Sequence, residues 1–201
     1  MTIDLSNKMS AKTSPNVSFK QPNAPQANRY VVIDFETTGF HPNQGHRVIE
    51  IGAVEIVNYQ IKDSYQTLIN PGIEIPRVAE NVHRISNAMI AGAPQPEPAF
   101  KDLLSFIGGS TIVAHNIRFE LAFMQAEFRR IGENPTLNSL CTLHAALTLY
   151  PTLRRHTLGY LLEHFGIKPT GPLHRALPDA QCTAELLLIM RKDDISGKII
   201  P

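Results

Sequence analysis

Two carboxylates at the end of an apolar stretch are the residues of this chain best placed for chemistry. Four apolar residues, mostly β-branched, lead into an Asp-x-Glu pair within Tyr30-Val-Val-Ile-Asp-Phe-Glu-Thr-Thr-Gly39. A continuous apolar run of this kind is typical of a strand buried on both faces. Because side chains alternate along a strand, Asp34 and Glu36 point to the same side, about 7 Å apart along the chain. Such a pair suits Mg²⁺ or Mn²⁺, although a strand that ends in an acidic, solvated turn would show the same residues.

Two further carboxylates fall at the expected starts of helices, on faces directed toward the core. Glu120 lies in the first turn of a helix predicted over residues 117–131, at the edge of its apolar stripe. Asp179 lies in the first turn of the last helix, which we expect to begin at Pro178. Acids also gain from the positive end of a helix, so Glu120 alone fits a surface role as well as a ligand role. His174 lies in the loop just before the last helix.

These four acids and the histidine predict the chemistry of phosphoryl transfer. Two divalent cations held by carboxylates can clamp the attacking and leaving oxygens of an in-line displacement. A histidine, with an unperturbed pKa of about 6.5, can accept a proton from the attacking water near neutral pH.

Apolar runs and turn residues place the remaining elements around these side chains. Strands expected at residues 30–36, at 47–57 and through Ile69 are joined by short turns, which predicts an antiparallel meander. Glu50 interrupts the second apolar run, and we expect it to pair with an arginine or a backbone donor rather than a metal. Asn116 is the expected N-cap of the helix that carries Glu120. The remaining expected elements are short helical pieces within 76–90, a strand at 111–114, and helices at 99–107, with Pro98 at its start, 140–150 and 157–165.

Composition indicates one ordinary domain with a terminal appendage. The chain has 201 residues, 43% hydrophobic and 18% charged, with a formal net charge of +1. That charge is too small to identify a nucleic-acid binder, so any phosphate-binding surface must be a local patch. The basic run Arg154-Arg155-His156 would suit phosphates if it borders the acidic site, and is otherwise a solvated loop.

The ends of the chain and its cellular setting are predicted from the same composition. Residues 1–28 are rich in Ser, Asn, Pro, Lys and Gln, which predicts a disordered tail before a folded domain over 29–192 and a C-terminal tail over 193–201. Cys141 and Cys182 lack metal or redox spacing. No apolar run is long enough to span a bilayer, so we expect no membrane partner and a cytoplasmic protein.

Three motifs resemble those of the DEDDh, or DnaQ-like, 3′–5′ exonucleases. They are Asp34-Phe-Glu-Thr-Thr-Gly39, His115-Asn-x-x-Phe-Glu120 and His174-x₄-Asp179, in the family's order and spacing. The resemblance extends over about residues 29–191. Within the family, this sequence is similar to the epsilon proofreading subunit of bacterial DNA polymerase III and to ribonuclease T. The spacing of the third motif indicates the histidine branch of the family.

The resemblance implies an RNase H-like α/β fold, with a five-stranded mixed sheet flanked by helices. It also implies two divalent cations, Mg²⁺ or Mn²⁺. Asp34 would bridge both cations, Glu36 and Asp179 would complete the tighter site, Glu120 would serve the second, and His174 would be the general base.

The same resemblance implies a substrate and the residues that contact it. The terminal nucleotide would lie against Thr37, Thr38, Gly39 and Phe40, with His83 and Asn116 nearby. The substrate would be a single-stranded or frayed 3′ end, with DNA favoured over RNA, and the products nucleoside 5′-monophosphates, as in proofreading or repair.

One residue departs from the family pattern and keeps other functions open. The second motif of the family ends in aspartate, whereas this chain has Glu120. A glutamate is one methylene longer, and a positioning error of an ångström can lower a rate by about 10². The alternatives are an exoribonuclease of the same chemistry and a catalytically weakened module that binds nucleic-acid ends. Association with a DNA polymerase and a homodimer are open as well.

Overall fold

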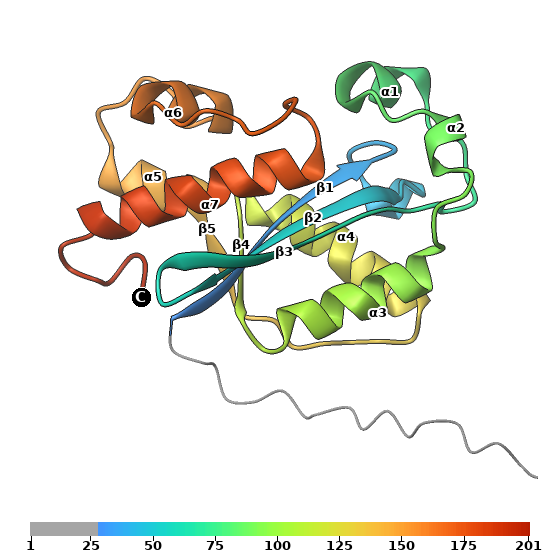
Figure 1. Cartoon of the computed structure of the whole chain (residues 1–201), viewed down its shortest axis with the longest axis horizontal. Coiled ribbons are helices and arrows are strands. Elements are labelled where there is room, and N and C mark those ends of the chain that lie inside the picture. Colours follow the sequence, from blue (N-terminus) through green and yellow to red (C-terminus); the bar gives the residue numbers. More distant parts are fainter. Residues whose placement is uncertain (1–27) are drawn as a thin grey trace, which may run out of the picture.

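The computed structural model describes residues 28–201, and these form a five-stranded sheet with helices on both faces (Figure 1). The disorder predicted for residues 1–28 lies, except for Asn28, outside the described residues. The strand order is β3-β2-β1-β4-β5, antiparallel across β3-β2-β1 and parallel across β1-β4-β5. The predicted meander and the mixed five-stranded sheet are therefore confirmed. The strands are β1 (Arg29–Thr37), β2 (Val48–Val57), β3 (Gln60–Leu68), β4 (Thr111–Ala114) and β5 (Ser139–Cys141).

The central strand β1 supplies a separate hydrophobic core on each face of the sheet. Val31, Ile33 and Phe35 pack with α3 and α4, whereas Tyr30 and Val32 pack with α5, α6 and α7. Burial on both faces explains why the β1 sequence is continuously apolar. The helices are η1 (Pro42–Gln44), α1 (Arg77–His83), α2 (Asn87–Ile90), α3 (Pro96–Ile107), α4 (Ile117–Arg130), α5 (Thr142–Leu149), α6 (Leu158–Phe165) and α7 (Ala176–Asp193).

Two predicted helix starts are wrong by two or three residues, both because of prolines. Helix α3 begins at Pro96 rather than at Pro98, so part of the expected linker is already helical. Helix α7 begins at Ala176, which places Pro178 at the third position instead of the first. The first four N–H groups of a helix have no partner within it, so a proline that lacks this group is tolerated anywhere in the first turn.

The helix predicted at residues 140–150 begins later than expected, because its first residues belong to a strand. Residues Ser139–Cys141 form the edge strand β5, with Leu140 paired to Val113, and helix α5 starts only at Thr142. Three residues are too few to show a strand period in the sequence.

The chain beyond α7 folds back onto the domain. The Asp194 carboxylate accepts hydrogen bonds from the backbone N–H groups of Ile199 (2.8 Å) and Ile200 (2.9 Å). The Ile200 side chain is fully buried in the core beside α7. Among the described residues, no helix combines the length and apolar character needed to cross a membrane.

Candidate active site

Three carboxylates meet where β1 ends against the start of α7. Asp34, Glu36 and Asp179 each offer an oxygen, and these oxygens all lie within 4.8 Å of one another. By strand alternation Asp34 and Glu36 share the side of Tyr30 and Val32, which is the side that α7 covers. The close approach of α7 depends on Gly52, the cross-strand partner of Asp34, because a Cβ there would lie 2.2 Å from the Ala176 carbonyl carbon.

The fourth predicted acid, Glu120, lies beside this group but outside it. Its side chain projects from the first turn of α4 and is only 4% exposed. Among the charged neighbours that raise the pKa of Asp34, Glu120 comes first, ahead of Glu36. The structure therefore brings three of the four acids into one possible metal site, with Glu120 next to Asp34.

Burial and mutual repulsion raise the pKa of every acid in this cluster. The pKa of Asp34 is well above its usual value because of burial first and its acidic neighbours second. Burial raises the pKa of Glu36 to about 8, with repulsion from Asp179 adding to it, and burial also raises the pKa of Glu120 to about 8. Burial likewise raises the pKa of Asp179. At neutral pH such a cluster binds either protons or cations.

Two buried carboxylate oxygens in this cluster lack any hydrogen-bond donor among the described residues. They are Oε2 of Glu120 and Oδ1 of Asp179. Because a buried polar atom without a partner is costly, such oxygens indicate a missing counter-charge. Hard oxygen donors in this number are the ligands that Mg²⁺ and Mn²⁺ prefer, so the residues fit the divalent cations expected from the sequence.

His174 stands at the rim of the acids on the loop before α7. Its side chain is exposed, its φ of 61° is left-handed, and its backbone N–H donates to Oδ2 of Asp179 at 3.0 Å. The next residue, Arg175, holds the fully buried Glu50 through contacts of 2.6 to 3.2 Å. Glu50 also accepts the Ala176 N–H at 3.0 Å, so its predicted role as a partner of an arginine and a backbone donor is confirmed.

Four of the expected substrate contacts form the turn that follows β1. Thr37 and Thr38 are buried, and the Thr37 hydroxyl donates to the Gly39 carbonyl at 2.7 Å. Gly39 packs against the ring of His46, which a Cβ at this position would approach to 2.5 Å. Phe40, at the end of this segment, is 77% exposed. An exposed ring next to a buried, polar turn is suited to stack on a base.

His83 and Asn116 reach this area from two other elements. His83 is only 3% exposed; its Nδ1 accepts the Ile85 N–H at 3.0 Å, which leaves the proton on Nε2. That Nε2 has no hydrogen-bond partner among the described residues. Asn116 is the N-cap residue of α4, as predicted, but it has a left-handed φ of 75° and its side chain makes no capping hydrogen bond. Its exposed amide is free for other contacts.

The basic run is linked to the end of β4 through a histidine whose role was not predicted. His115 follows β4, and its Nε2 lies 2.9 Å from the His156 carbonyl while its Nδ1 lies 3.0 Å from the Thr142 hydroxyl. These contacts tie the exposed Arg154 and Arg155 to the end of the strand next to β1. Spacing alone could not reveal this, because the partners are 27 and 41 residues apart.

A separate groove of about 560 Å³ runs between η1 and the outer side of α4. None of the acids lines it; its residues include His41, Gln125 and Arg129.

Residues 31–187 match the model of an exonuclease family, RNase T. The chain is 34% identical over 160 residues to the DNA polymerase III subunit epsilon of Aquifex aeolicus, covering 79% of this chain and 78% of that protein. It is 35% identical over 163 residues to the PolC-type DNA polymerase III of Clostridium perfringens, covering 80% of this chain and 11% of that protein. It thus spans about a tenth of the length of the PolC-type relatives. Exonuclease X in complex with 5′ overhanging duplex DNA has a TM-score of 0.65 and 27% identity, covering 82% of this chain and 92% of that one.

Proposed function

The chain belongs to the RNase T-type exonuclease family, and on that premise we propose that it is a metal-dependent 3′–5′ exonuclease. It would hydrolyse the terminal phosphodiester bond of a single-stranded or frayed 3′ end and release nucleoside 5′-monophosphates. The observation that carries the proposal is the cluster of Asp34, Glu36 and Asp179, whose oxygens lie within 4.8 Å of one another.

The acids are proposed to hold two divalent cations, Mg²⁺ or Mn²⁺. Asp34, Glu36 and Asp179 would hold one, and Asp34 with Glu120 the other. When bound, the cations neutralise charge on the phosphate and activate water. The acids themselves keep their carboxylates in a fixed arrangement, because β1 and the α7 start are packed in the core on both sides of them.

His174 is proposed as the general base. Its side chain is exposed to solvent, and its backbone N–H donates a hydrogen bond to Asp179. The backbone of His174 is held by its hydrogen bond to Asp179, and the following residue, Arg175, is held by its contacts with Glu50. The ring itself can still turn to meet a water molecule at the phosphate.

The terminal nucleotide is proposed to lie between the turn after β1 and the end of α1. Thr37, Thr38 and Gly39 would contact its sugar, and Phe40 would stack on its base. The unpartnered Nε2–H of His83 would donate a hydrogen bond to it, and Asn116 would line the opposite side.

DNA is the proposed substrate, because the curated relatives are named as parts of DNA polymerase III and the 27% identical structure is a complex with DNA. The same names support a DNA polymerase as a possible partner. A cytoplasmic location stays a prediction, and the oligomeric state stays open.

A second function is favoured by one observation, the position of Glu120 outside the three-carboxylate group. If the longer side chain prevents the second cation from binding, the protein would bind nucleic-acid ends without cutting them. Tight oligonucleotide binding without turnover, unchanged when Glu120→Asp restores the family residue, would support this function.

The proposal is tested with a single-stranded DNA labelled at either end, incubated with Mg²⁺, Mn²⁺ or EDTA. We expect a descending ladder from the 5′ label, immediate mononucleotide from the 3′ label, and no product in EDTA. A matched RNA in competition decides between DNA and RNA. Intact DNA and RNA with both metals would refute the exonuclease.

A further inference from the structure

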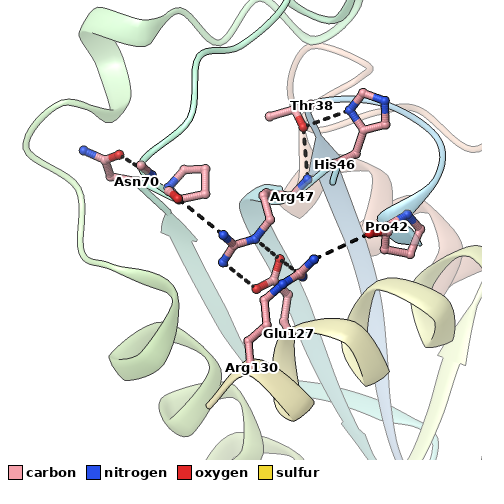
Figure 2. A network of polar contacts seen from close by, with 9 residues as sticks. Thr38, Pro42, His46, Arg47, Asn70, Glu127 and Arg130 are labelled. Carbon is pink, nitrogen blue, oxygen red and sulfur yellow. Dashed lines mark hydrogen bonds and ion pairs between the residues drawn. The ribbon is translucent and has the colours of Figure 1, made fainter. Parts of the chain in front are cut away.

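The loop that follows β1 is tied to α4 through a buried ion pair that the proposed reaction does not use (Figure 2). Arg47 binds Glu127 through two parallel hydrogen bonds, from Nε to Oε1 at 2.7 Å and from Nη2 to Oε2 at 2.8 Å. The Glu127 side chain is 1% exposed and that of Arg47 is 17% exposed. A bidentate pair with this burial fixes both the distance and the orientation of the two elements.

The backbone of Arg47 closes the same loop at its base. Its N–H donates to the Thr38 hydroxyl at 3.0 Å, and its carbonyl accepts the Thr38 N–H at 2.9 Å. The Thr38 hydroxyl also lies 3.3 Å from Nδ1 of His46, whose ring packs on Gly39. The position of Arg47 therefore sets the position of Thr38 and Gly39 directly.

Helix α4 links this ion pair to the acids. Glu120 and Glu127 are seven residues apart, so they lie on one face of the helix, about 10 Å apart along its axis. Both are buried. Arg130 adds a second contact to Glu127 at 3.1 Å and reaches the Pro42 carbonyl near the tip of the loop at 3.5 Å.

A third segment joins at the same arginine. Nη1 of Arg47 donates to the Pro71 carbonyl at 3.4 Å, in the turn that precedes the segment carrying α1 and His83. Figure 2 shows the Arg47 guanidinium between this turn and Glu127. One side chain thus contacts α4 and the 70–72 turn, while its backbone holds Thr38.

We propose that Arg47 is a positioning residue for the terminal nucleotide, acting through Glu127. The Arg47–Glu127 pair fixes the distance between the Thr38–Phe40 turn and Glu120. It thereby fixes where the last nucleotide lies relative to the acids. This inference rests on the proposed exonuclease function. No atom of Arg47 needs to touch the substrate.

The test uses Arg47→Lys, which keeps the positive charge opposite Glu127 but loses the bidentate geometry, and Glu127→Gln, which keeps the shape and loses the charge. The matched control is Glu97→Gln, the same chemical change in an exposed ion pair with Lys101 on α3. KM and kcat are measured on a single-stranded DNA with Mn²⁺. The affinity for a nucleoside 5′-monophosphate is measured separately by calorimetry, and folding by thermal unfolding.

We expect Arg47→Lys and Glu127→Gln to raise KM and the Kd of the mononucleotide about tenfold, and to lower kcat by up to about 10² because the terminal nucleotide is displaced from the acids. The control should match the wild type in all three. The rise in KM and Kd separates positioning from stability, because a partly unfolded enzyme loses kcat in proportion to its folded fraction while KM stays constant.

Unchanged KM and mononucleotide affinity in folded Arg47→Lys would overturn the inference, as would a loss of kcat alone. If Glu127→Gln does not fold, Arg47→Lys decides, since it leaves no unpaired buried charge. A wild type that binds the mononucleotide but does not cut DNA would refute the proposed function, and the calorimetry would still decide the role of Arg47.

Discussion

Two groups of acids in this molecule differ in what faces them, Glu50 and Glu127 on one side and the acids at the end of β1 on the other. Glu50 and Glu127 are completely buried, and each is held by an arginine, Arg175 and Arg47 respectively. Burial raises the pKa of Glu50, but hydrogen bonds from Arg175 and the Ala176 N–H outweigh this effect, and the pKa is lowered overall. These two acids are charged, satisfied parts of the framework.

Among residues 28–201, no arginine forms an ion pair with the acids at the end of β1. The pKa of Glu36 and that of Glu120 rise to about 8, and buried oxygens of Glu120 and Asp179 have no donor in the described part of the chain. Arg175 lowers the pKa of Glu36 only in part, because its guanidinium is engaged by Glu50. Burial therefore does not distinguish a site from a framework here; the missing counter-charge does.

The largest expected effect comes from removing the acid in the centre of the unpaired group. Asp34→Asn should abolish detectable turnover, because it removes the carboxylate that both proposed cations share. The metal-free protein should be at least as stable as the wild type, because the substitution relieves repulsion with Glu120 and Glu36. Gel assays with Mn²⁺ and urea unfolding in EDTA measure the two effects. Surviving activity would mean that the site is misplaced.

The matched substitution in the paired group should act in the opposite direction. Glu50→Gln removes the charge opposite Arg175 and should lower the free energy of unfolding by about 3 kcal/mol, as for one partner of a buried pair. Metal binding, measured by calorimetry with Mn²⁺ on the folded fraction, should persist. If Asp34→Asn and Glu50→Gln destabilise the protein equally, the distinction between the two groups of acids is wrong.

The sequence predicts one side of this comparison better than the other. Asp34 and Glu36 could be selected because they end an apolar strand, and Glu120 and Asp179 because they lie in the first turns of helices, on faces directed toward the core. His174 could be selected because its loop leads into the last helix, and the order of all five resembles a known family. The partners in the framework could not be predicted, because Arg47 and Glu127 are 80 residues apart and Glu50 and Arg175 are 125 apart. Charge pairing at such separations depends on how α4 and α7 pack on the sheet.

The same limit applies to element boundaries. The strand Ser139–Cys141 exists because it pairs with β4, so its three residues carry no period of their own. Helix α7 begins before Pro178, which the first turn tolerates, and Glu50 accepts the N–H of its first residue, Ala176. Both features involve tertiary contacts that local sequence does not encode.

The next effect concerns His174, at the border between the two groups. His174→Ala should lower kcat by about 10² to 10⁴, the usual contribution of a general base, while cation and substrate binding remain. The backbone hydrogen bond to Asp179 does not depend on the side chain, so the loop should be retained. Single-turnover rates and Mn²⁺ calorimetry separate the two effects. A large loss of Mn²⁺ affinity would make His174 a ligand.

The dependence of the free energy of unfolding on pH distinguishes the two groups of acids without any assay of activity. Glu36 and Glu120 have a folded pKa of about 8 against an ordinary value of 4.5, so the folded state binds more protons between these values. Stability should therefore fall as pH rises from about 4.5 to about 8 in EDTA, by up to about 1.4 kcal/mol per unit of raised pKa. The lowered pKa of Glu50 acts in the opposite sense, at pH values below 4.5.

Urea unfolding at several pH values, with EDTA or with Mg²⁺, measures this dependence. Mg²⁺ should flatten the fall, because a cation that binds the ionised acids replaces the protons. A flat profile in EDTA would mean that the acids are already compensated in the free protein.

The smallest expected effect is that of Glu120→Asp, which tests whether Glu120 serves as a ligand of the second proposed cation. Aspartate is one methylene shorter, so its carboxylate withdraws toward α4 while the buried position and the charge are kept. If the glutamate crowds the second cation, the substitution should raise kcat with Mg²⁺ by up to about tenfold and reduce the preference for Mn²⁺. If the glutamate already reaches that cation, kcat should fall by a similar factor with both metals. Equal rates for both variants would show that Glu120 contributes charge to Asp34 but no ligand, which would leave one cation site, formed by Asp34, Glu36 and Asp179.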